Sequence, residues 1–202
     1  MSFDRESLCE YSSEESAFMK GALSANRDGV PMRMSLVAKE YALCDFSMFE
    51  EDAPFMGDDA SGEEILAKMF AEAEKHPASE EYSVSCDAEF VRVGDRCEIR
   101  YNECLDGETT QLTIITFDES VPGLVTVYKS GMATVTMTIE AGQRHSCIYR
   151  TPFMDFEMRL RATRVENSVS EAGGRILMDY ALEIRGAVCH RTVMEIVVEP
   201  VE

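Results

Sequence analysis

From Ser83 onward the sequence alternates apolar and polar residues with a period of two, and turn-forming residues interrupt the pattern about every ten residues. In residues 155–164, for example, Phe156, Met158 and Leu160 share one face, and the positions between them are charged. A strand places successive side chains on opposite faces of its sheet, so this pattern predicts half-buried antiparallel strands. Helical periodicity does not separate them, which argues against a parallel α/β sheet.

The expected strands are bounded by Gly, Asp and Pro residues, which tight turns require. They cover residues 83–93, 96–103, 109–117, 124–130, 132–140, 144–151, 155–164, 174–185 and 188–198. Earlier in the chain, residues 32–38 alternate in the same way and are expected to form a further strand. An open sheet of so many strands would expose unpaired edges, and closing the sheet removes them. The sequence therefore predicts a mainly β fold, an antiparallel up-and-down barrel of about 8–10 strands.

The first part of the chain carries most of the acidic excess. Residues 1–90 hold 21 acidic and 7 basic side chains, out of 38 and 19 in the whole chain. We expect residues 1–31 to form an acidic N-terminal extension that is mobile or contains a short helix, because they offer little apolar area to bury. Residues 32–202 are expected to form a single barrel domain with a helical insertion at about 45–80.

One amphipathic helix is predicted at about 61–75, inside this insertion. Ser61 and Glu64 have the spacing of a capping box, and Pro77 prevents the helix from continuing. Its apolar stripe recurs at helical spacing and consists of Ile65, Leu66, Met69, Phe70 and Ala73. Such a stripe can dock a partner protein, together with the acidic extension, or pack on its own domain, and we favour the second interpretation.

The net charge of −19 shapes the expected partners and location. Phosphate backbones and anionic lipids would be repelled, so we expect neither a nucleic-acid nor a membrane partner. The first residues lack a basic stretch followed by an apolar run, and we therefore expect a cytoplasmic protein. The seven cysteines are an odd number without C-x-x-C spacing, which favours reduced thiols. A disulfide between Cys97 and Cys104 across a hairpin is the alternative.

Four short segments, taken in order and spacing, resemble the YwiB-like family of bacterial proteins of unknown function. They are Cys97–Glu103, Tyr128–Gly131, Tyr149–Phe153 and Gly174–Leu182. The resemblance covers about residues 83–199 and implies a calycin-like β-barrel, the shape shared by lipocalins and fatty-acid-binding proteins. Met154 stands where the family pattern has a glycine. The family has no established catalytic residues, so the resemblance implies a fold and no reaction.

The sequence shows no pattern typical of a catalytic or metal site. The three histidines are His76, His145 and His190, and the one cysteine at ligand spacing is Cys147, two residues after His145. Zinc needs three or four converging ligands. The sequence also lacks a G-x-S-x-G nucleophile motif and a glycine loop that leads into a helix. We therefore expect a protein that is not an enzyme and holds no metal or cofactor.

The inner face of the barrel is the predicted binding site, because small barrels are either filled by side chains or hold one small ligand. A carboxylate beside tyrosine hydroxyls in an apolar enclosure can orient a polar ligand group, or it can fix strand register as a structural network. The residues predicted nearest to the ligand are Tyr101, Glu103, Tyr128, Tyr149 and Tyr180.

The predicted function is non-catalytic binding of a small apolar or amphipathic ligand in the barrel. This prediction depends on fold analogy and on which residues share a face. The alternative is a protein–protein interaction or regulatory module that uses the acidic extension and the inserted helix. A homodimer through an apolar strand face is compatible with either function.

Overall fold

The computed structural model describes residues 29–43, 60–104, 110–184 and 187–201. Within these ranges the chain forms ten strands and one helix, in the order β1 Val30–Ala42, α2 Ala60–Ala73, β2 Glu80–Val93, β3 Arg96–Cys104, β4 Thr110–Asp118, β5 Leu124–Ser130, β6 Thr134–Glu140, β7 Arg144–Arg150, β8 Asp155–Asn167, β9 Gly174–Ile184 and β10 Ala187–Pro200. Each strand expected from the alternation is present, and the strand-like stretch expected at residues 32–38 forms β1.

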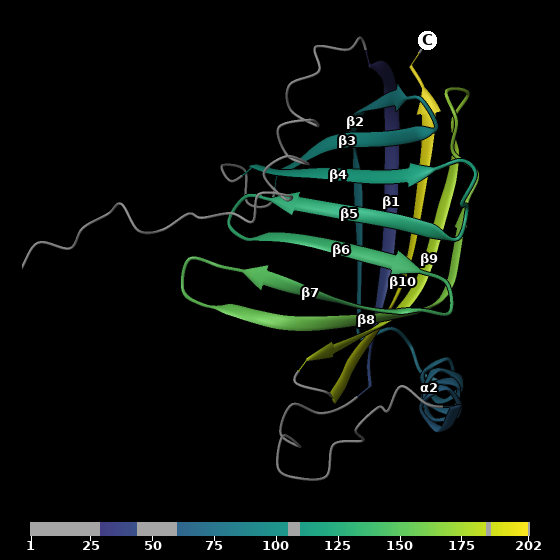
Figure 1. The fold of residues 1–202 in the computed structure, drawn as a ribbon, viewed down its shortest axis with the longest axis vertical. Helices are drawn as coiled ribbons and strands as arrows, with labels where there is room; N and C mark the ends of the chain where they lie inside the picture. Colours follow the sequence, from purple (N-terminus) through teal and green to yellow (C-terminus); the bar gives the residue numbers. More distant parts are fainter. Residues whose placement is uncertain (1–28, 44–59, 105–109, 185–186, 202) are drawn as a thin grey trace, which may run out of the picture.

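The strands close into an antiparallel barrel in which each strand pairs with its neighbours in sequence, and β10 returns to β1. The predicted up-and-down barrel is therefore confirmed. Figure 1 shows that β3 to β7 cross the direction of β1, β9 and β10 steeply, so the barrel is flattened into two layers. The pairing of β10 with β1 removes the two outer edges that an open sheet of these strands would have.

Two strands connect the layers. β2 pairs with β1 over Val30↔Phe90 to Glu40↔Glu80, but it pairs with β3 only over Ala88–Val93. β8 pairs with β7 over residues 155–161 and with β9 over residues 158–167, with a bulge between Ala162 and Arg164. A bulge bends a strand, which lets β8 turn from one layer to the other. The first halves of β2 and β8 therefore stand at one end of the barrel, where the ladders diverge.

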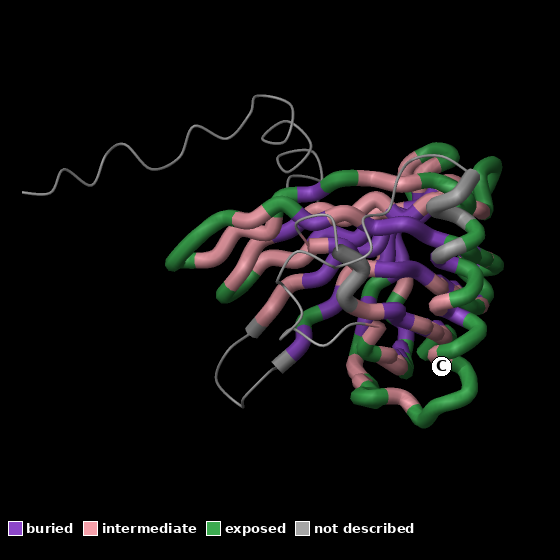
Figure 2. The backbone as a smooth tube through the Cα atoms, turned by 90° about the horizontal axis from the view of Figure 1, so that it is seen from below, coloured by how far each residue is buried: buried purple, intermediate pink, exposed green. Residues whose placement is uncertain are grey.

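The middle of the barrel is filled by side chains. Figure 2 shows that the buried segments of the backbone lie toward the middle of the molecule, whereas many turns at its periphery are exposed. The largest side chains with almost no exposed surface all come from the alternating inner positions: Met32, Met34, Leu36, Phe90, Ile99, Ile115, Ile139, Leu160, Ile176, Met178 and Ile196. The rings of Phe90 and Phe117 lie 6.5 Å apart at the end where β2 and β3 are joined by their turn. We call this the closed end of the barrel.

The helix α2 packs on the outer face of the barrel. Leu66 and Phe70 are buried against Ala181 of β9, with Leu43 and Met69 beside them. Leu66, Met69 and Phe70 of the apolar stripe thus pack within their own domain, as the sequence favoured. Among the described residues no helix is long and apolar enough to cross a membrane.

Two expectations concern cysteines and the N-terminal extension. The disulfide proposed between Cys97 and Cys104 across a hairpin is wrong in its geometry, because both residues lie on β3, seven positions apart along an extended strand. Cys86, Cys97 and Cys147 are free thiols. The acidic extension and its short helix fall on residues 1–28, outside the described residues.

Candidate functional site

The barrel has a polar end opposite the closed end, which we call the barrel mouth. Here the inner positions change from aliphatic to polar, because the alternation that gives Met34, Leu36 and Ala38 continues into Glu40. The inner-facing residues that define the mouth are Glu40, Tyr82, Tyr101, Glu103, Thr113, Lys129, Tyr180 and Thr192. They come from β1 to β5, β9 and β10.

One wall of the mouth is a row across three paired strands. Tyr101 is opposite Thr113, and Thr113 is opposite Lys129. Glu103 lies two residues further along β3, and its Oε1 is 3.5 Å from Thr113 Oγ1 and 3.7 Å from Lys129 Nζ. The Glu103 side chain is only 10% exposed, yet both contacts are long for hydrogen bonds. The Tyr101 hydroxyl also makes a hydrogen bond with Glu103. The buried carboxylate thus has two hydroxyl partners and one more distant cation, Lys129, and it can accept from a closer cationic donor.

The second wall is a row on the other layer. Tyr180 is opposite Thr192, and Thr192 is opposite Glu40. Tyr82 lies diagonally beside Glu40, because its direct partner on β1 is Ala38. Tyr82 is 39% exposed, whereas Tyr180 is buried. The row therefore runs from the barrel interior at Tyr180 to the solvent at Tyr82.

The tyrosine pKa values show that these hydroxyls stay protonated. Burial raises the pKa of Tyr82 to about 12, with further contributions from Glu40 and Glu103. Burial, and then the charge of Glu103, raises the pKa of Tyr101. Burial is also the main cause of the raised pKa of Tyr180, to which Tyr82 and Glu40 add. Tyr82 lies within electrostatic range of both Glu40 and Glu103, as expected if the two walls face each other. The tyrosine hydroxyls are hydrogen-bond donors at neutral pH, because they stay protonated.

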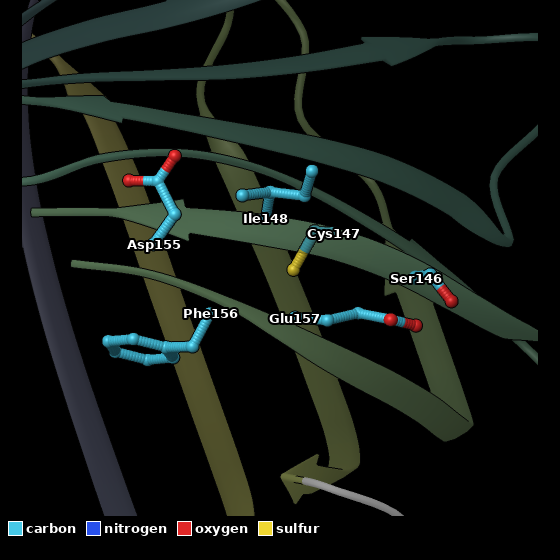
Figure 3. Close-up of a pocket in the computed structure, with 6 residues that line it drawn as sticks. All are labelled: Ser146, Cys147, Ile148, Asp155, Phe156 and Glu157. Carbon is cyan, nitrogen blue, oxygen red and sulfur yellow. The ribbon is translucent and has the colours of Figure 1, made fainter.

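An aromatic pair adjoins the mouth on the β7–β8 hairpin. Tyr149 and Phe156 are opposite each other, with ring centroids 5.1 Å apart and an interplanar angle of 28°. A cavity of about 510 Å³ lies at this hairpin, lined by Ser146, Cys147, Ile148, Asp155, Phe156 and Glu157. Figure 3 shows Cys147 and Phe156 on one side of the hairpin and Ile148 and Asp155 on the other. Burial raises the pKa of the Cys147 thiol to about 11, so it is not an activated nucleophile.

A second cavity, of about 560 Å³, opens where β2 leaves β3. The ladder between these strands ends at the pair Ala88↔Tyr101, and the strands diverge beyond it. The cavity is lined by Cys86, Asp87, Ala88, Glu89, Arg100, Tyr101, Asn102 and Leu112, which include residues from both faces of the two strands. It therefore gives a lateral opening beside Tyr101 at the mouth.

The structure brings most of the predicted site residues together. Tyr101, Glu103 and Tyr180 lie at the mouth, and Tyr149 lies on the adjoining hairpin. Tyr128 lies elsewhere: it packs with Ile114 in a separate cluster, on the opposite face of β5 from Val125 and Val127. Successive residues of a strand point to opposite faces of the sheet, and the two valines point into the barrel. The Tyr128 side chain therefore points outside the barrel, and Tyr128 forms no part of the mouth.

Sequence reasoning missed five residues of the mouth, namely Glu40, Tyr82, Thr113, Lys129 and Thr192. Lys129 shares a face with Val127, and Thr113 shares a face with Ile115, so alternation alone could have placed them. Glu40 and Tyr82 lie just beyond the expected strand limits. Extending each strand by two residues at period two would have included them.

The described residues hold no group of three or more His, Cys, Asp or Glu side chains that could bind a metal ion. His145 Nε2 lies 2.8 Å from Glu140 Oε2, so this histidine is engaged in a side-chain pair at the β6–β7 turn. The chemistry available at the mouth is thus that of two carboxylates, one ammonium and several neutral hydroxyls beside aromatic rings. Such a set can orient the polar group of a bound molecule.

Comparisons with known proteins agree with this fold. A family model described as a domain of unknown function, DUF1934, matches residues 68–196. The crystal structure of the YwiB protein from Bacillus subtilis is similar to this chain, with a TM-score of 0.61 and 16% sequence identity. The match covers 87% of this chain and 95% of that one. At this identity the likeness shows the fold alone. A comparison with curated proteins finds no match.

Proposed function

The chain belongs to the DUF1934 family, a domain of unknown function, and from this premise we propose that its barrel mouth binds a small amphipathic molecule. The polar group of the molecule would lie between the two walls, and its apolar part would lie against the rings of Tyr149 and Phe156. The deeper barrel is filled by side chains, so the proposal is restricted to the open end.

The observation that carries the proposal is the buried carboxylate of Glu103, whose cationic partner, Lys129, lies 3.7 Å away. Burying a carboxylate costs free energy unless it is paired and hydrogen-bonded at short distance. Glu103 makes a side-chain hydrogen bond with the Tyr101 hydroxyl, but its contacts with Thr113 and Lys129 are 3.5 Å and 3.7 Å long. The neutral partner is therefore held more closely than the cationic one, Lys129. A ligand group that donates to Glu103 at ordinary hydrogen-bond distance would stabilise the buried carboxylate further.

Native mass spectrometry tests the proposal directly. The purified protein is incubated with a metabolite extract, and bound species are measured for the wild type and two matched variants. Val84→Trp adds a large ring at a half-buried inner position near the mouth, whereas Val37→Trp adds it on the outer face of β1. We expect a bound species with the wild type and Val37→Trp, and none with Val84→Trp. An equal result for all three proteins would refute binding at the mouth.

The alternative function, a protein interaction module, loses part of its support. Leu66 and Phe70 of α2 are covered by the barrel, so these two residues of the apolar stripe are not free to dock a partner. The acidic extension lies outside the described residues. The cytoplasmic location and the homodimer stay predictions.

A further inference from the structure

We propose that the polar group accepted by the mouth is an organic cation, an ammonium group carried on an apolar tail. This inference depends on the proposed function, because it names the chemical class of the ligand that the mouth would bind. Three features of the mouth support this choice of ligand: its two carboxylates, its neutral hydroxyls and its aromatic rings.

The first argument is the placement of the carboxylates. Glu40 stands on the wall made by β1, β9 and β10, and Glu103 stands on the facing wall made by β3 to β5. Tyr82 lies within electrostatic range of both. A group placed between the walls thus has a carboxylate on each side. In a site partly screened from water, this arrangement favours a positive charge.

The second argument concerns Lys129, which has an ion pair with Glu103 in the described part of the mouth. Its Nζ is 3.7 Å from Glu103 Oε1, beyond ordinary hydrogen-bond distance, and its side chain is 22% exposed. A lysine stem is flexible and can carry its ammonium outward into water. An incoming ammonium can therefore take the place of Lys129 beside Glu103 without leaving an unpaired buried charge.

The third argument is the aromatic lining. Tyr82 and Tyr101 belong to the mouth, and Tyr149 adjoins it stacked on Phe156. The faces of aromatic rings attract ammonium groups, and tyrosine is among the rings used for this purpose. The hydroxyls of Tyr82 and Tyr101 remain neutral, so they add no competing negative charge of their own and can donate to the two carboxylates.

An anionic head group fits this site poorly. It would face Glu40 and Glu103 with a single neighbouring ammonium, and it would approach a molecule of net charge −19. Desolvating a like-charge contact of this kind opposes binding. A neutral head group could donate to Glu103 but would gain nothing from the negative potential between the walls.

Three probes with the same tail separate these cases by titration calorimetry: octylammonium, octyl glucoside and octyl sulfate, each below its micelle concentration. We expect the cationic probe to bind about tenfold more tightly than the neutral one, since a charge-assisted contact exceeds a neutral one by roughly this factor, and the anionic probe to bind weakest. The preference should persist at 0.5 M salt, which screens the general surface charge.

Two matched variants locate the effect. Glu103→Gln should weaken binding of the cationic probe about tenfold and leave octyl glucoside almost unchanged. Glu195→Gln removes one exposed carboxylate from the outer face of β10 and should change neither affinity. If octyl glucoside binds the wild type as tightly as the cation does, and Val84→Trp still blocks it, then mouth binding stands and the cation preference is wrong. If none of the probes binds the wild type, both proposals fail.

Discussion

The guanidinium carbon of Arg191 lies 4.4 Å from the centre of the Phe70 ring, which joins β10 to a helix 121 positions earlier in the chain. The same guanidinium donates to the Phe70 carbonyl, at 3.3 Å, and to both carboxylate oxygens of Asp179, at 2.9 and 2.8 Å. It also lies over the ring of Tyr41. One buried cation thus satisfies a helix carbonyl and a strand carboxylate together, and it attaches α2 to the barrel.

Replacing Arg191 with methionine is therefore expected to destabilise the protein. The methionine keeps the packing length but leaves Asp179, whose side chain is 15% exposed, without its partner. Breaking such a buried pair from one side costs about 2–4 kcal/mol. Urea unfolding measures the change. Arg175→Met, which breaks exposed pairs with Glu166 and Glu195, is the control and should cost less than about 1 kcal/mol. Equal losses for the two variants would contradict the anchoring role of Arg191.

Most of the fold can be predicted from local patterns in the sequence. The strand limits depend on alternation and on turn residues such as Gly94 and Gly142, both of which adopt positive φ. These signals act over a few residues, so they can be recognised without tertiary information. The position of α2 on the outside of the barrel depends instead on Arg191, far along the chain. No local pattern predicts that contact.

The candidate site was only partly predictable, for a related reason. Leu124, Val125, Val127 and Tyr128 include apolar residues of both parities, so the sequence does not tell which face of β5 is inside. Pairing with β4 settles it, because Tyr128 is opposite Ile114, which lies outside the main core. The register across several strands likewise brings Glu40 to the wall facing Glu103, and no spacing within one strand contains that information.

The ion pair between Lys129 and Glu103 gives a second prediction. Lys129→Met should cost about 1–2 kcal/mol, because Glu103 stays buried and loses its cation. Glu103→Gln removes the charge and keeps the shape, so the double variant should recover most of that loss. A double-mutant cycle in urea isolates the coupling free energy. Additive losses, with no recovery in the double variant, would show that Lys129 does not stabilise Glu103.

The Cys147 thiol should make stability depend on alkaline pH. Its pKa is raised by burial from 9.0 to about 11, so the folded state keeps a proton that the unfolded state releases. The contribution is fully present below pH 9 and is lost as the pH rises towards 11, by about 1 kcal/mol after allowance for screening by water. Under reducing conditions, the free energy of unfolding should therefore fall less between pH 9 and 11 for Cys147→Ala than for the wild type. Ser146→Ala, next to it on the same strand, should behave like the wild type, and a parallel decline in all three proteins would exclude this cause.

Gly174 should not tolerate a side chain. Its φ is +140°, and a Cβ there would lie 2.4 Å from the Ser168 carbonyl oxygen, at the turn that joins β8 to β9. The position of the Cβ is fixed by the backbone of residue 174, and the oxygen belongs to the backbone of Ser168, so neither atom can move away independently. Gly174→Ala is therefore expected to cost more than about 2 kcal/mol. Gly123→Ala is the matched control, because the nearest atom to its Cβ would be 3.8 Å away and its φ is not positive. Thermal unfolding of the two variants separates strain from a general effect of adding a methyl group. A similar melting temperature for both would contradict the close approach at Gly174.

Phe90 and Phe153 are expected to contribute very differently to stability, because one ring is buried at the closed end and the other is exposed on a turn. Phe90 is 1% exposed and packs against Phe117 at the closed end, whereas Phe153 is 95% exposed on the β7–β8 turn. Phe90→Ala should cost about 3–5 kcal/mol, because it removes a buried ring and leaves a cavity. Phe153→Ser should change the free energy of unfolding by less than about 0.5 kcal/mol, because the turn is held by the Thr151 hydroxyl, which accepts from the Phe153 and Met154 amides and donates to the Met154 carbonyl. Guanidinium unfolding measures both, and Thr151→Val checks the turn itself, since it should destabilise more than Phe153→Ser. A large loss in Phe153→Ser would mean that this ring is covered in solution.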